Sequence, residues 1–231
     1  AGIEAARDAF YKGPIAKRIA EFIRENPVMD ASGEAHAGLL SEEDMSEWEA
    51  TIEQPVTYDY KGLDVYKCPP WTQGPVFLQQ LAILKGFDLQ GQGHNSPEYL
   101  HTVVESSKLA FADRDTYYGD PLFDETPLGM LLSEDYSVGR RELVGETASM
   151  DFRPGDLGGG VPDYALASVA DDNRRALGIG ARDVQDLGFD HAHVGDTTHL
   201  DAVDSEGNMV AATPSGGWLG TSPIIEGLGF P

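Results

Sequence analysis

The sequence changes character near Ser149. Before this residue, apolar side chains recur every three or four positions, which is the spacing of one face of a helix. After it, residues 151–204 contain eleven Asp, no Glu and four Arg, and glycine is frequent, as in Gly158–Gly160. Glycine and proline interrupt regular structure. The sequence therefore predicts a mainly helical part up to about residue 145 and a flexible, poorly packed acidic loop over about 150–195.

Local patterns place helices and hairpins on either side of this loop. The segments Ile3–Phe10 and Ile15–Ile23 are expected to form two short helices or one kinked helix. Further helices are expected from about Ser41, over Pro75–Leu84, and from Ser96 to Tyr117 or Tyr118. β-Rich runs on both sides of Lys61–Gly62 predict a hairpin. A second hairpin is expected to start at Thr197 or Thr198, turn over 204–208 and return over Met209–Thr213. These elements predict an α+β chain with a helix-rich N-terminal part.

Composition excludes several classes of partner. Thirty-nine acidic residues against sixteen basic ones give a formal charge of −23, so a phosphate backbone is repelled from most of the surface. No apolar run approaches the roughly 18 residues that a membrane-spanning helix needs. The glycine runs lack the spacing and the lysine of a phosphate-binding loop. We therefore expect no nucleic acid partner, no membrane span and no cofactor.

Three histidines lie close together in the sequence, His191, His193 and His199. A His-x-His pair on an extended segment can direct both imidazoles toward one metal ion. No paired cysteines accompany them, and a solvated loop is their expected environment. We predict that this cluster holds no functional metal.

Three aspartates near the end of the longest expected helix are a second set of candidates. Asp113, Asp115 and Asp120 offer carboxylates for general acid and base catalysis. The chain is strongly acidic, however, and Asp120 precedes Pro121, as turn residues often do. We interpret this stretch as an exposed helix face followed by a turn.

The segment Gly195–His199 offers a more specific chemistry, because it leads from the acidic loop into the second hairpin through two threonines. A threonine hydroxyl in a strained loop can attack its own preceding carbonyl and form an ester, which water then opens. The new N-terminal threonine has an α-amine that can serve as its general base. Threonine is also common in ordinary strands, so the spacing alone leaves both readings open.

Five stretches follow one another along the chain: Asp8–Gly13, Ala37–Asp44, Tyr60–Tyr66, Lys108–Arg114 with Gly119–Pro121, and Asp196–His199 with Val203–Asp204 and Gly207–Asn208. In this order they resemble the γ-glutamyltransferase (γ-glutamyltranspeptidase) family of N-terminal-nucleophile hydrolases, and the resemblance covers nearly the whole chain. The last stretch contains the threonine at which this family processes itself.

The resemblance implies a four-layer αββα sandwich of which this chain is a fragment. It implies a precursor that cleaves itself between Asp196 and Thr197. Residues 1–196 are then the C-terminal part of a large chain, and residues 197–231 are the start of a small catalytic chain that stays associated with it. Thr197 becomes the nucleophile, carries a γ-glutamyl ester and passes the acyl group to water or to an amine. Ser215 stands where the family has a second threonine, whose hydroxyl orients the nucleophile.

The same resemblance leaves the substrate open. Ser215 and Gly217 mark the expected substrate-binding stretch, and Gly217 replaces the asparagine that helps to hold the substrate's α-carboxylate. The family's arginine for that carboxylate is expected before residue 1. Its aspartate for the α-amine and its oxyanion glycines are expected after residue 231, so the fragment alone should turn over little or nothing.

Three readings of the function remain. The first is a hydrolase or transferase of γ-glutamyl amides such as glutathione, and the second is an acylase or amidase with a non-glutamyl substrate. The third is a non-catalytic homologue that acts as an acidic binding module. Family analogy places the protein in the periplasm or outside the cell.

Overall fold

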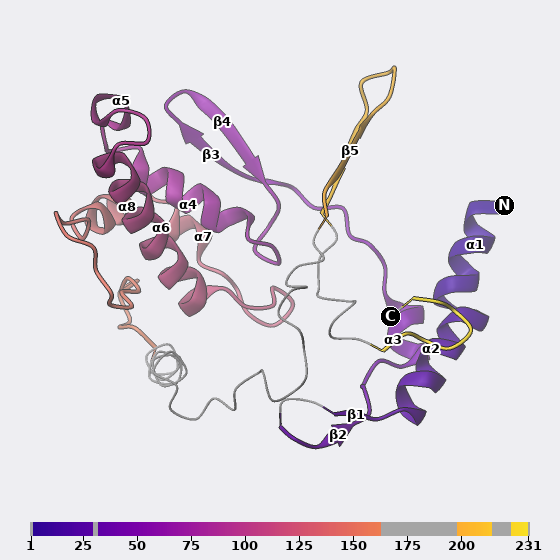
Figure 1. Cartoon of the computed structure of the whole chain (residues 1–231). Helices are drawn as coiled ribbons and strands as arrows, with labels where there is room; N and C mark the ends of the chain where they lie inside the picture. The colour runs from indigo at the N-terminus through magenta and orange to yellow at the C-terminus, as the bar shows by residue number, and fades with distance from the viewer. Residues whose placement is uncertain (1, 30–31, 163–197, 214–222, 231) are drawn as a thin grey trace. The chain divides into compact units, whose positions relative to one another are not determined.

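A computed structural model describes four stretches of the chain, residues 2–29, 32–162, 198–213 and 223–230 (Figure 1). Its elements in chain order are α1 (Gly2–Tyr11), α2 (Pro14–Glu25), β1 (Val28–Met29), β2 (Ala35–His36), α3 (Glu42–Glu47), β3 (Val56–Tyr60), β4 (Leu63–Lys67), α4 (Gly74–Leu84), α5 (Leu89–Gln92), α6 (Pro97–Tyr117), α7 (Leu128–Leu131), α8 (Glu134–Arg141), β5 (Leu200–Val203) and β6 (Met209–Ala212). They divide into two compact units, residues 1–51 with 182–231, and residues 52–181.

The unit that includes residues 1–51 has a small core on α2. Pro14 is the first residue of α2, a position where the missing N–H of proline costs no hydrogen bond. The buried face of α2 packs against α3 and the C-terminal stretch, and this core consists of Ala16, Ile19, Met45 and Ile225.

Helix α3 begins at a reciprocal cap, as its sequence predicts. The Ser41 hydroxyl accepts a hydrogen bond from the Asp44 N–H at 3.1 Å, and the Asp44 carboxylate accepts one from the Ser41 N–H at 2.8 Å. Both bonds satisfy donors that a helix start leaves without partners. The expected helix start at Ser41 is therefore confirmed.

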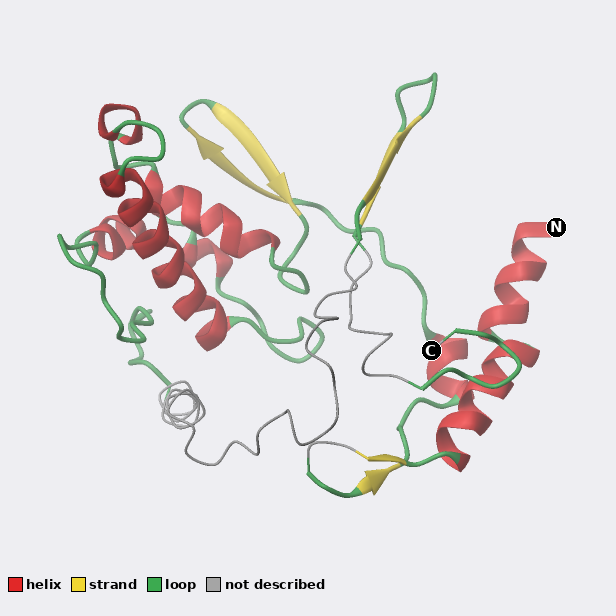
Figure 2. Ribbon diagram, viewed as in Figure 1, coloured by secondary structure: helices red, strands yellow, loops and turns green. Residues whose placement is uncertain are grey.

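The unit of residues 52–181 is built around α4 and α6, which pack against each other (Figure 2). Val76 and Ile83 of α4 meet Leu109 and Ala110 of α6 in the core. Helix α4 is apolar around most of its circumference, so it needs cover on more than one side. Helix α8 and the β3–β4 hairpin also pack against it.

The β3–β4 hairpin has the two-residue turn that its sequence predicts. Tyr60 pairs with Leu63, and the turn residues Lys61 and Gly62 have φ angles of 54° and 87°. Positive φ at both positions matches the right-handed twist of the flanking strands. This hairpin is confirmed.

The β5–β6 hairpin is also confirmed, although its first strand is shorter than expected. The ladder pairs Leu200 with Ala212 and Val203 with Met209. Strand β5 begins at Leu200, whereas Thr198 is described and lies in no strand. The turn is held by Asp204, whose carboxylate accepts hydrogen bonds from backbone N–H groups.

The chain is α+β, and the strands of the described residues form three two-stranded antiparallel sheets. The helices expected from periodicity are confirmed as α1, α2, α3, α4 and α6, while β1, β2, α5, α7 and α8 were not predicted. The four-layer arrangement stays a prediction. Within the described residues, no helix combines the length and the apolar character that crossing a membrane requires.

Candidate functional site

The predicted cleavage junction and the residues expected beside it lie outside the described residues: Asp196, Thr197, Ser215 and Gly217. The described stretch 198–213 begins one residue after Thr197 and ends two residues before Ser215.

At the open end of this hairpin, His199 links two other side chains. Its Nδ1 lies 2.6 Å from the Thr213 Oγ1, and its Nε2 lies 3.0 Å from an Asp201 carboxylate oxygen. A carboxylate only accepts, so Nε2 carries a hydrogen. Nδ1 accepts from the Thr213 hydroxyl in a neutral ring and donates to it in a protonated one. We call this set (His199, Asp201 and Thr213) the His199 clamp.

The expectation that the histidine cluster holds no metal remains a prediction, because His191 and His193 lie outside the described residues. Over the stretches that the structure describes, no three His, Cys, Asp or Glu side chains gather as a metal site requires. His199 instead makes the two contacts of the His199 clamp.

Two buried carboxylates on α6 form a polar centre that the sequence did not predict. Asp113 has no solvent exposure. Its carboxylate lies 3.1 Å from the Arg140 guanidinium and accepts hydrogen bonds from the Gly155 N–H at 2.7 Å and from the Gln79 amide. Burial is the largest influence and raises the pKa of the Asp113 carboxyl, while the Arg140 charge lowers it.

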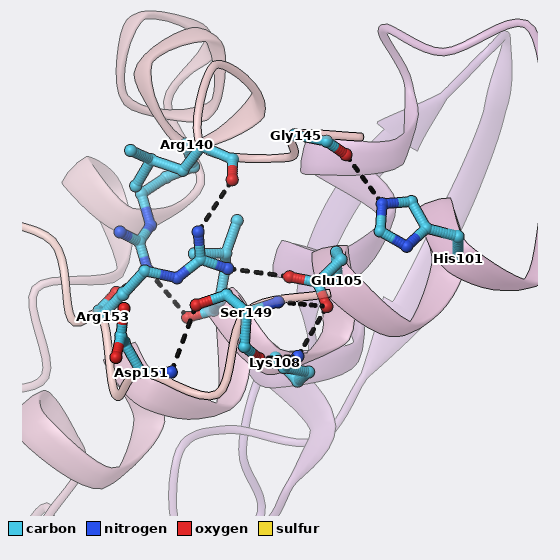
Figure 3. Close-up of polar contacts among 10 residues, drawn as sticks. His101, Glu105, Lys108, Arg140, Gly145, Ser149, Asp151 and Arg153 are labelled. Carbon is cyan, nitrogen blue, oxygen red and sulfur yellow. Dashed lines mark hydrogen bonds and ion pairs between the residues drawn. The ribbon is translucent and has the colours of Figure 1, made fainter. Parts of the chain in front are cut away.

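Glu105, about two turns earlier on α6, is 1% exposed. Its carboxylate accepts hydrogen bonds from Lys108 at 2.5 Å, from Arg153 at 2.9 Å and from the Ser149 N–H at 3.3 Å (Figure 3). Burial acts to raise the pKa of Glu105, but these donors and the two positive charges lower it on balance.

The same contacts fasten the start of the acidic loop to α6. Arg140 donates to the Arg153 carbonyl at 2.6 Å, and the Tyr117 hydroxyl donates to the Gly155 carbonyl. The expectation of a poorly packed segment from about 150 is therefore wrong for residues 152–155, because two buried carboxylates need their donors. Residues 163–195 lie outside the described stretches, and for them the expectation stays a prediction.

The interpretation of Asp113 as part of an exposed helix face is also wrong. Asp113 lies four positions after the buried Leu109 and seven after the buried Ser106, so all three share one face of α6. The spacing from Leu109 is visible in the sequence, but the burial of this face is not. Asp115 and Asp120 are exposed as expected, and the Asp120 carboxylate caps a turn by accepting from the Leu122 N–H at 2.9 Å.

A groove of about 470 Å³ beside the end of α6 is lined by Trp71, Gln73, Arg114 and Tyr118, among others. The Arg114 guanidinium donates to the Gln73 amide oxygen at 2.8 Å and to the Asp115 carboxylate. Its positive charge is thus paired with the partly exposed Asp115 carboxylate.

Comparison with known proteins identifies the family of this chain. The γ-glutamyltranspeptidase family profile matches residues 3–231. A glutathione hydrolase proenzyme of Escherichia coli (strain K12) is 29% identical over 214 residues, which are 91% of this chain and 30% of that relative.

Two solved structures are also similar. A structure of LmbA2991 is 45% identical with a TM-score of 0.80, over 99% of this chain and 36% of that one. A cephalosporin acylase from Bacillus halodurans is 32% identical with a TM-score of 0.56, over 64% of this chain and 25% of that one. The chain thus spans about a third or less of these relatives. The profile match over nearly its whole length shows that the chain belongs to the γ-glutamyltranspeptidase family.

Proposed function

We propose that this chain is part of a self-processing enzyme that hydrolyses or transfers γ-glutamyl groups from amides such as glutathione, with Thr197 as its nucleophile. The observation that carries the proposal is the match of the γ-glutamyltranspeptidase family profile to residues 3–231, a span that includes the Asp196–Thr197 junction. The β5–β6 hairpin, which pairs Leu200 with Ala212, follows this junction within a few residues.

The proposed chemistry uses one hydroxyl twice. Thr197 Oγ first attacks the Asp196 carbonyl, the peptide C–N bond breaks, and the nitrogen takes up a proton to become the α-amine. Water then hydrolyses the ester, which restores the Thr197 hydroxyl and leaves Asp196 as the end of the large chain. In turnover the α-amine acts as general base, Thr197 forms a γ-glutamyl ester, and water or an amine accepts the acyl group. The large chain, of which residues 1–196 are a part, and the small chain, which begins at Thr197, remain associated, and no cofactor takes part.

The mass of the purified intact gene product tests this proposal. Two chains that meet between Asp196 and Thr197 are expected. A single uncleaved chain from correctly folded protein would exclude the enzyme and favour a non-catalytic, acidic binding homologue.

An acylase with a non-glutamyl substrate is the second candidate. Gly217 favours it, because a glycine has no side-chain amide to bind a substrate's α-carboxylate. The similarity to a cephalosporin acylase also favours it. The ratio of kcat/KM for γ-glutamyl-p-nitroanilide and glutaryl-p-nitroanilide separates the two. These substrates share a leaving group and differ in the α-amine, so a preference for the glutaryl compound selects the acylase.

Ser215→Ala should reduce kcat roughly ten- to a hundredfold if its hydroxyl orients Thr197, at about 1.4 kcal/mol per tenfold. Steady-state kinetics of the processed enzyme measure this effect. Ser205→Ala in the exposed turn of the same hairpin is the matched control and should retain wild-type kcat. Equal activity of both variants would remove Ser215 from the mechanism.

A further inference from the structure

The groove beside the end of α6 combines an exposed aromatic side chain with a pair of opposite charges. Trp71 is 59% exposed, and its indole N–H donates to the Glu53 carboxylate. The Arg114 guanidinium lies over the Phe111 ring at 4.7 Å and donates to the Gln73 amide oxygen at 2.8 Å. These contacts orient both side chains before a ligand binds, which lowers the entropy cost of binding.

The charged pair in this groove has capacity left for a ligand. Arg114 donates from Nε and from a terminal nitrogen to one and the same oxygen, Oδ1, of Asp115. A guanidinium has five N–H groups, and the contacts to Asp115 and Gln73 use three of them. Among the described residues, no group bonds the other two or the second Asp115 oxygen. Spare donors therefore lie beside a spare acceptor, and both side chains are partly exposed.

A zwitterion suits this pair better than a single charge does. An anion that reached Arg114 would also meet the Asp115 carboxylate, and a cation at Asp115 would also meet the guanidinium. An α-amino acid carries its carboxylate and its ammonium group on one carbon atom, so the two groups can meet two side chains that touch each other. The exposed indole of Trp71 offers a flat apolar surface to an aromatic side chain.

We propose that this groove binds a free α-amino acid with an aromatic side chain. Arg114 receives the carboxylate, Asp115 receives the ammonium group, and Trp71 packs against the ring. The groove volume of about 470 Å³ lies within the range of small-molecule sites, roughly 300–1,000 Å³. The inference goes beyond the proposed function, because it uses neither Thr197 nor acyl transfer.

Four probes test the three contacts by isothermal titration calorimetry on the full-length protein. L-Phenylalanine has all three groups, whereas 3-phenylpropionate lacks the ammonium group, phenethylamine lacks the carboxylate and glycine lacks the ring. L-Phenylalanine should have a Kd at least roughly tenfold lower than each of the others, because each of them loses one contact.

Two variants locate the bound amino acid in this groove. Trp71→Ala should raise the Kd of L-phenylalanine roughly tenfold and leave that of glycine unchanged. Tyr66→Ala is the matched control, because Tyr66 is 58% exposed in the same unit and does not line the groove, and it should keep the wild-type Kd.

Asp115→Asn retains the size of the side chain and removes its charge, so its result does not depend on a change in packing. It should weaken L-phenylalanine roughly tenfold, because the ammonium group loses its counter-charge. It should also bind 3-phenylpropionate at least as tightly as L-phenylalanine, since Arg114 is then no longer paired with a carboxylate. A merely structural role of Asp115 would not change the preference between the two probes.

Three results would overturn the inference. They are no binding of L-phenylalanine at millimolar concentration, equally tight binding of 3-phenylpropionate by the wild type, and a wild-type Kd for L-phenylalanine in both Trp71→Ala and Asp115→Asn. The proposed function fails separately: an uncleaved wild-type chain that binds L-phenylalanine through Trp71 and Asp115 refutes the enzyme and keeps the groove. A cleaved, active enzyme whose two groove variants bind as the wild type does refutes the groove alone.

Discussion

Thr197→Ala in the intact precursor is expected to give a single uncleaved chain with no measurable turnover. Alanine has no hydroxyl, so neither the ester that opens the Asp196–Thr197 bond nor the γ-glutamyl ester of turnover can form. Intact mass and a γ-glutamyl-p-nitroanilide assay measure the two losses separately. In the proposed mechanism one oxygen atom forms both esters, so both losses have the same cause.

Two further variants locate the nucleophile to one residue. Thr197→Ser retains the oxygen and loses a methyl that restricts χ1, so cleavage should continue more slowly. Thr198→Ala should leave cleavage largely intact, because consecutive side chains of an extended segment are expected to point in opposite directions. Cleavage and activity in Thr197→Ala, together with their loss in Thr198→Ala, would move the nucleophile by one residue and the strand register with it.

The elements that the sequence predicted are those whose signals are local. The helix start at Ser41 depends on a residue three positions later, Asp44. The β3–β4 turn depends on two adjacent residues, Lys61 and Gly62. In both cases the atoms that satisfy the backbone lie within a few residues, so one short window of sequence contains the whole interaction.

The buried centre on α6 was missed because its partners come from far along the chain. Arg153 lies 48 positions after Glu105, and Gly155 lies 42 positions after Asp113. A carboxylate without a visible partner is ordinarily expected at the surface. Only the fold brings the guanidinium and N–H groups close enough to make its burial favourable.

The apolar residues of α6 are a second feature that the sequence did not predict correctly. Leu100, Val104 and Phe111 fit the helical period, yet they lie on the outer face of this unit, where Leu100 is 49% and Val104 is 53% exposed. The buried face instead carries polar residues such as Thr102 and Ser106. Periodicity identified the helix, but it did not identify which face is buried, because it weighs hydrophobicity and not long-range pairing.

In the candidate site, too, some residues were predicted from the sequence and others were not. The family resemblance named Thr197 and Ser215, because each is identified by matching its own stretch of sequence to the family. The His199 clamp was not predicted, because it joins His199 to Thr213 across 14 positions. The turn at Asp204 and the register that follows from it determine which residues meet.

Asp113→Ala should destabilise the protein by about 3–5 kcal/mol, which is the usual cost of leaving one member of a buried ion pair alone. Arg140, 4% exposed, would keep its charge without the carboxylate 3.1 Å away, and the Gly155 N–H would lose its acceptor. At about 2–4 °C per kcal/mol, the thermal midpoint should fall by roughly 6–20 °C. The Gly155 amide hydrogen should also exchange with solvent faster than in the wild type, because its acceptor is gone.

Two controls connect this loss to the buried pair. Asp115→Ala removes a half-exposed carboxylate from the same helix, and it should change stability by no more than about 0.5 kcal/mol. The double variant Asp113→Leu with Arg140→Met removes both charges and should recover much of the stability, since no unpaired charge remains buried. If Asp113→Ala unfolds at the same temperature as Asp115→Ala, the Asp113 carboxylate does not hold residues 152–155 on α6, and their packing has another cause.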